Sequence, residues 1–113
     1  MKKESVEVLK ECIELQLAKS KDYQNPKSNI KQAMHYRRGV DTIHDMIHQK
    51  LLRAQSLLEA DGEVKFESLE DTYKDMINYS SFAVSYIRGK MEGQDPTRDM
   101  FNKLKPHGKI DED

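Results

Sequence analysis

Glycine and proline are scarce in this chain, and they stand between segments of helical periodicity. The 113 residues include three prolines and five glycines. Between them, apolar side chains recur at the three-to-four-residue spacing that places them on one face of an α-helix. Strand-like alternation nowhere extends beyond four residues. The pattern therefore predicts an all-α fold, a small bundle of about four helices.

The periodic segments also predict where these helices lie. We expect helices over about residues 3–21, from Ser28 or Asn29 to Arg38, from Asp41 or Thr42, and over about residues 67–88. Stripes expected to face the core are Val6, Leu9, Ile13 and Leu17; Ile43, Met46, Ile47, Leu51, Ala54, Leu57 and Leu58; and Leu69, Tyr73, Met76, Ile77, Ser80, Val84 and Ile87. Weaker periodicity then predicts a helical domain at residues 1–91 and a weakly ordered tail at residues 92–113.

Charged residues make up 35% of the chain and apolar residues 36%, so the core of one copy is modest. Part of the stability is therefore expected from a homo-oligomer, a dimer or tetramer. The net charge of −1, with mixed signs, argues against duplex nucleic acid as a partner. No apolar stretch is long enough to span a membrane, and the single Cys12 fits a reducing cytoplasm.

An acidic stripe runs along the last predicted helix. Glu67, Asp71, Asp75 and Asn78 are spaced to share one face, and Glu4, Glu7, Glu11 and Glu14 do the same on the first helix. Carboxylates on facing helices commonly hold Mg²⁺ or Mn²⁺. Tyr79 and Phe82 extend the last stripe, although a solvated face seldom carries phenylalanine. The acids are therefore either metal ligands or a solvated surface.

Positive and aromatic side chains have two readings each. Lys50 and Arg53 either contact phosphate or extend along the core edge into solvent, and Lys19, which flanks Asp22 at the end of the first helix, either contacts phosphate or is solvated. Asp22 either caps a turn or joins the metal site. Tyr23, Tyr79 and Phe82 either stack on a base or pack in the core. The pattern "HDMIH" resembles a zinc-protease motif, but a chain this small lacks the sheet and cleft of those enzymes.

Three short motifs carry a resemblance to a known family. They are "KSKDY", with Lys19, Asp22 and Tyr23; "KLLR", with Lys50 and Arg53; and "ESLEDTYKDMINY", with Glu67, Ser68, Asp71, Thr72, Asp75, Asn78 and Tyr79. With them, the chain resembles the MazG-like all-α nucleoside triphosphate pyrophosphohydrolases. It is nearer to a group of small phage and bacterial nucleotide-modification-associated proteins. The resemblance covers roughly residues 9–90.

The resemblance implies Mg²⁺- or Mn²⁺-dependent hydrolysis of a (deoxy)nucleoside triphosphate to monophosphate and pyrophosphate, in the cytoplasm or in a phage host's cytoplasm. The implied metal ligands are Glu11, Glu14, Glu67, Asp71 and Asp75, the last three of them catalytic. The implied substrate-binding residues are Lys19, Asp22, Tyr23, Lys50, Arg53 and Asn78. Ser68 stands where the MazG-like motif has glutamate. A non-catalytic nucleotide-binding protein and a structural helical interaction module are the alternatives.

Overall fold

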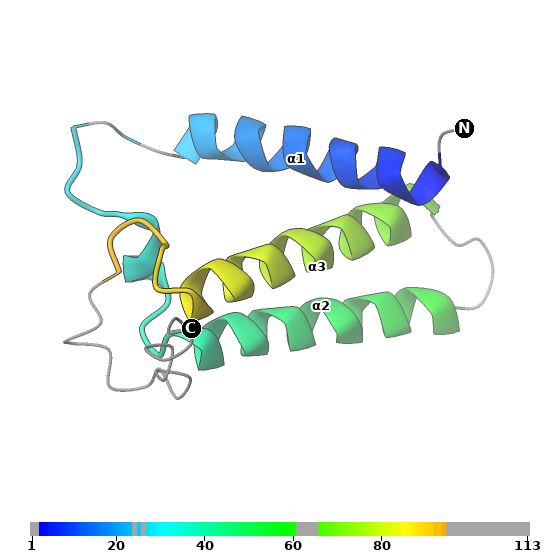
Figure 1. Cartoon of the computed structure of the whole chain (residues 1–113). Helices are drawn as coiled ribbons and strands as arrows, with labels where there is room; N and C mark the ends of the chain where they lie inside the picture. The colour runs from blue at the N-terminus through cyan, green and yellow to red at the C-terminus, as the bar shows by residue number, and fades with distance from the viewer. Residues whose placement is uncertain (1–2, 24, 26, 61–65, 95–113) are drawn as a thin grey trace, which may run out of the picture.

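The computed structural model describes residues 3–23, 25, 27–60 and 66–94, and over these residues the regular structure is entirely helical. The elements are α1 (Glu4–Tyr23), the 3₁₀ turn η1 (Gln32–His35), α2 (Val40–Glu59) and α3 (Phe66–Ile87) (Figure 1). The predicted all-α class is confirmed, and three of the expected helices are present. The expected short helix ending at Arg38 is only the single 3₁₀ turn η1.

The three helices lie in one layer with α3 in the middle (Figure 1). α2 and α3 form an antiparallel hairpin, and α1 packs on the other side of α3. The buried core gathers at one end of this hairpin, where the start of α2 and the end of α3 meet η1. Its members are Ala33, Tyr36, Ile43, Tyr86 and Met91.

Gly39 allows this end of the hairpin to close. Its φ is +61°, in a region of backbone space that residues with a Cβ disfavour. A Cβ at Gly39 would also lie 3.0 Å from the Tyr86 ring. The backbone N–H of Gly39 donates to the Tyr36 carbonyl at 2.9 Å, so this glycine ends the turn after η1 and starts α2.

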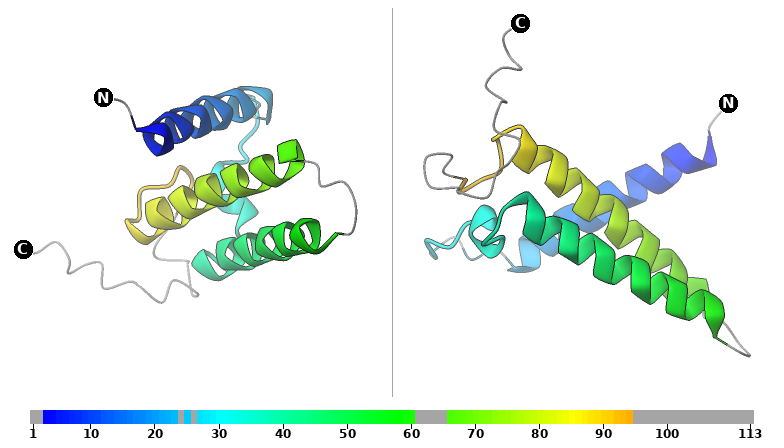
Figure 2. Two further views of the ribbon diagram at one scale, coloured as in Figure 1. Left: turned by 90° about the vertical axis from the view of Figure 1, so that its right-hand side faces the viewer. Right: turned by 90° about the horizontal axis from the view of Figure 1, so that it is seen from below.

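The predicted core face of α1 is wrong. Val6, Leu9, Ile13 and Leu17 are 43% to 63% exposed, whereas Cys12 is buried. α1 crosses the α2–α3 pair obliquely, so only part of its length lies over α3 (Figure 2). Its contacts with α3 include several polar ones, and the surface that docks it is therefore not its apolar stripe.

The predicted stripe of α3 is rotated from the face that is buried. Tyr73 and Val84 are exposed, and Thr72 and Tyr86 are buried instead. The Thr72 hydroxyl donates to the Ser68 carbonyl at 2.8 Å, which satisfies its hydrogen bond within the helix. Because α3 lies between two helices, its contacts are divided between two faces, and neither face has to be the most apolar one. On α2, Leu51 and Leu58 are likewise exposed.

The segment after α3 folds back onto η1. Met91 is buried, the Ala33 N–H donates to the Glu92 carbonyl at 3.0 Å, and Gln94 Nε2 donates to the Tyr86 carbonyl at 2.9 Å. This part of the expected tail is thus tied to the core, while residues 95–113 lie outside the described residues. In the described part of the chain, no helix is long and apolar enough to cross a membrane.

Candidate nucleotide site

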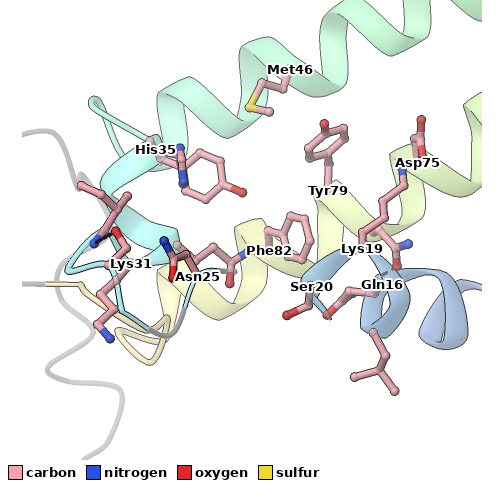
Figure 3. A pocket seen from close by; sticks show the side chains of 16 residues that line it. Gln16, Lys19, Ser20, Asn25, Lys31, His35, Met46, Asp75, Tyr79 and Phe82 are labelled. Atoms are coloured by element: carbon pink, nitrogen blue, oxygen red, sulfur yellow. Dashed lines mark hydrogen bonds and ion pairs between the residues drawn. The ribbon is translucent and has the colours of Figure 1, made fainter. Parts of the chain in front are cut away.

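A pocket of about 660 Å³ lies where the C-terminal half of α1, the segment around η1 and the middle of α3 meet. Small-molecule sites commonly have volumes of about 300–1,000 Å³. Figure 3 shows the side chains that line it. The lining residues are Gln16, Leu17, Lys19, Ser20, Asn25, Ser28, Ile30, Lys31, Gln32, His35, Tyr36, Met46, Asp75, Asn78, Tyr79 and Phe82.

One wall of the pocket is aromatic. Tyr79 and Phe82 project from α3 and meet edge to face, with ring centroids 5.9 Å apart and planes at 79°. Tyr36, beside η1, is buried, and that burial raises the pKa of its hydroxyl. His35, from η1, also lines the pocket (Figure 3). These rings offer flat surfaces on which a planar base can stack.

Amide side chains fix the position of α1 at the pocket edge. Gln16 Nε2 donates to Asn78 Oδ1 at 3.1 Å and approaches Ser81 Oγ at 3.2 Å. Asn78 Nδ2 donates in turn to the Cys12 carbonyl at 3.1 Å. Both ends of the Asn78 amide are therefore used in holding α1 on α3. Asn78, expected to contact substrate, lines the pocket, but its polar atoms contact α1.

Asp75 of α3 forms ion pairs with lysines of both neighbouring helices. Lys50 Nζ, from α2, lies 3.0 Å from Asp75 Oδ2, and Lys19 Nζ, from α1, lies 3.4 Å from Asp75 Oδ1. The Asp75 side chain is 20% exposed, so these contacts are partly shielded from solvent. Each of the three sequence motifs supplies one of these residues. We call this group the Lys19–Asp75–Lys50 triad.

A second ion pair joins α1 to α3 beside the triad. Lys74 Nζ lies 2.8 Å from Glu11 Oε1. The pKa of the Lys74 ammonium is raised, chiefly by its hydrogen bond to Glu11, with the charges of Glu70 and Asp71 adding to the effect. Burial raises the pKa of the neighbouring Cys12 thiol, although Lys74 partly opposes this. Glu11 of α1 and Asp75 of α3 are thus already paired with lysines.

The remaining expected site residues are spread over the surface. Glu14, Arg53, Glu67 and Asp71 are exposed. The side chains of Asp22 and Tyr23, at the end of α1, lie outside the described residues. Among the side chains that the structure does describe, no three His, Cys, Asp or Glu residues are grouped to hold a metal ion. A preformed all-protein Mg²⁺ cage is therefore not present in this part of the chain.

A comparison with known protein families gives a match over most of the described helices. Residues 19–86 match the family described as "Nucleotide modification associated domain 1". The chain belongs to this family. The matched region contains the whole triad and the aromatic wall, so the pocket lies largely within what the family shares. Searches of curated proteins and of solved structures gave no significant match.

Sequence reasoning missed several pocket residues, above all Gln16, His35 and Tyr36. None of them belongs to the three motifs. Gln16 is a single amide on α1, and His35 and Tyr36 lie at the expected short helix, which carried no functional pattern. The only available signal was the imidazole and aromatic pair "HY" itself, at His35 and Tyr36.

Proposed function

We propose that this chain binds a nucleoside triphosphate in the pocket between α1, η1 and α3. The observation that carries the proposal is the triad: two ammonium groups from different helices converge at the edge of a pocket with an aromatic wall. Ammonium groups bind phosphate oxygens as compact point charges, and rings stack on bases. Membership of a nucleotide-modification-associated family supports the same ligand class.

The two chemical parts of a nucleotide fit different parts of the pocket. Tyr79 and Phe82 offer the base an aromatic surface with polar groups nearby. Lys19 lines the same pocket, and Lys50 forms an ion pair with Asp75, which also lines it. The phosphates would therefore lie toward the middle of α3 and the base toward η1. A free, buried thiol at Cys12 supports a cytoplasmic setting.

Calorimetric titration with the four NTPs and four dNTPs tests binding. Lys50→Met should weaken binding of the preferred nucleotide about 10-fold, because it removes one ammonium contact worth roughly 1–2 kcal/mol. Lys90→Met is the matched control, since Lys90 is an exposed lysine after α3 that does not line the pocket. If no nucleotide binds, or if both variants behave like the wild-type chain, the proposal is wrong.

Hydrolysis of the bound triphosphate to monophosphate and pyrophosphate is a second candidate function. Glu67 and Asp71 precede Asp75 along one side of α3 and are exposed, so they remain open to a ligand. Mg²⁺ is usually bound by one or two carboxylates together with substrate phosphates, which needs no preformed cage. Glu67 and Asp71, with Glu11 or Glu14 from α1, would hold it; bound there, it neutralises phosphate charge and activates water.

Release of pyrophosphate, measured with Mg²⁺ or Mn²⁺ across the same nucleotide panel, tests this candidate. Asp71→Ala should abolish turnover and leave the thermal unfolding midpoint nearly unchanged, because Asp71 is exposed. Nucleotide binding without any pyrophosphate release would mean that the chain binds nucleotides but does not hydrolyse them. Unchanged turnover in Asp71→Ala would exclude Asp71 from the chemistry. This second proposed function includes the proposal that the chain belongs to the MazG-like superfamily, because the resemblance to that superfamily implies the hydrolysis.

The exposed stripe of α1 also supports a homodimer. Val6, Leu9, Ile13 and Leu17 form a continuous apolar row with few contacts in one copy. If two α1 helices pack antiparallel with Val6 opposite Leu17, Lys10 comes within one residue of the level of Glu14 on the same flank. The row can thus pack against the same row of a second copy with opposite charges beside it, as a two-fold interface requires. Leu17 also lines the pocket, so the second copy would lie against the nucleotide site.

A further inference from the structure

The Asp75 carboxylate is held in the way that a protein holds a phosphate group. Each of its two oxygens faces a different ammonium: Oδ1 faces Lys19 at 3.4 Å and Oδ2 faces Lys50 at 3.0 Å. These lysines come from α1 and α2, on the two sides of α3. Without an anion between them, the two ammonium groups would repel each other. The Asp75 carboxylate offsets this repulsion, as a phosphate at the same position would.

We propose that Asp75 is an internal stand-in for phosphate, and that an oligophosphate ligand takes Lys19 and Lys50 away from it. The inference rests on the proposed nucleotide binding and deepens it, because it assigns the phosphate subsite and the residue that competes for it. Asp75 then sets the affinity for phosphate and positions the lysines, and is not itself a catalytic residue.

The two contacts differ in how easily they break. The Lys19 side chain is 51% exposed and its contact is the longer one, so water competes well for it. The Lys50 side chain is 30% exposed and lies closer. Lys19 and Asp75 both line the pocket. An entering phosphate would therefore meet Lys19 first, and Lys50 would follow when Asp75 loses its first partner.

Charge favours the exchange. A triphosphate carries several negative charges and many acceptor oxygens, whereas Asp75 offers one charge and two oxygens. The ligand must nevertheless displace Asp75 and then lie beside its released carboxylate. Asp75 therefore lowers phosphate affinity while keeping the empty site assembled. Removing the Asp75 charge should strengthen binding, which is the opposite of what removal of a metal ligand or catalytic carboxylate would do.

The test is calorimetric binding of inorganic tripolyphosphate in EDTA, so that no divalent metal takes part. Asp75→Asn should bind roughly 3- to 10-fold more tightly than the wild-type chain, since about 1 kcal/mol of competing ion pairing is removed. Glu70→Gln, an exposed residue of the same helix, makes the same change in net charge and should alter affinity less than 2-fold. Lys50→Met should weaken binding.

Equal effects of Asp75→Asn and Glu70→Gln, or weaker binding by Asp75→Asn, would overturn the stand-in role. Should Asp75→Asn not fold, the ¹³C shift of the Asp75 carboxyl in the wild-type chain answers the same question. It should move on saturation with tripolyphosphate, and an unmoved signal would contradict displacement. The proposed function is tested separately, because it fails if nucleoside triphosphates do not bind the wild-type chain or if Lys50→Met leaves their affinity unchanged.

Discussion

At the scale of single residues, polar groups do much of the joining between helices. Asn78, half-buried on α3, donates a hydrogen bond to the Cys12 carbonyl of α1 and accepts one from Gln16. Asp75 reaches both neighbouring helices through lysines. Such contacts specify direction and register as well as proximity. They bring together one residue of each motif, Lys19, Lys50 and Asp75, at the edge of the pocket, while the apolar core lies at the end of the hairpin.

Gly39 offers a sharp test of this end of the hairpin. Gly39→Ala should destabilise the fold by roughly 2 kcal/mol or more, because alanine disfavours this backbone conformation and its Cβ would press on Tyr86. Gly89→Ala is the matched control: φ is also positive there, but a Cβ would meet nothing within 4 Å. Urea unfolding of both variants compares them. Equal losses of stability would show that contact with Tyr86 contributes nothing.

At the scale of elements, α1 is the helix least committed to its own chain. α2 and α3 pack along their length, whereas α1 crosses them obliquely and keeps its apolar row exposed (Figure 2). α1 nevertheless supplies Gln16 and Lys19 to the pocket. A partner that covers the apolar row would therefore also hold one wall of the site in place.

Substitution of that row should change the oligomeric state. Light scattering coupled to gel filtration should give about twice the 13.2 kDa chain mass for the wild-type protein. The double variant Leu9→Lys with Ile13→Lys should be a monomer, because two lysines per copy would then be buried in the interface. Leu52→Lys is the control, since Leu52 is 55% exposed on α2 and outside this row. Dissociation of the control as well, or a monomeric wild-type chain, would exclude this interface.

At the scale of the whole molecule, stability should fall in alkaline solution. Burial raises the pKa of Cys12 and of Tyr36, so the folded state prefers their neutral forms and the unfolded chain ionises first. The hydrogen bond to Glu11 raises the pKa of Lys74, so the folded state prefers its charged form, and this stabilisation is lost as pH rises through the raised value. All three shifts act in the same direction.

The urea midpoint should therefore be lower at about pH 10.5 than at about pH 8, the range in which these groups titrate. Cys12→Ala removes one of the three groups, and its midpoint should fall less steeply over the same range. A midpoint that is constant up to pH 10.5 would contradict the argument. If the urea midpoints of the wild-type chain and of Cys12→Ala change equally with pH, the Cys12 thiol does not contribute to the loss of stability.

The positions of the helices and the acidic motif could be read from the sequence. Scarce glycine and proline, together with helical periodicity, predicted α1, α2 and α3 to within a few residues. These features are local, because a helix forms from contacts between residues three or four apart. The three motifs also led to the family, since short spacings of charged residues are visible without a fold.

Only the tertiary structure decided which faces are buried and which charges meet. Hydropathy marks the most apolar face of α1, but the crossing of α1 over α3 leaves Leu9 and Ile13 exposed and buries Cys12. Lys19, Lys50 and Asp75 lie in separate motifs, and their meeting depends on the antiparallel hairpin and on where α1 crosses it. The physical reason is that one helix can pack through apolar or polar groups, and the number and direction of its neighbours determine which is used.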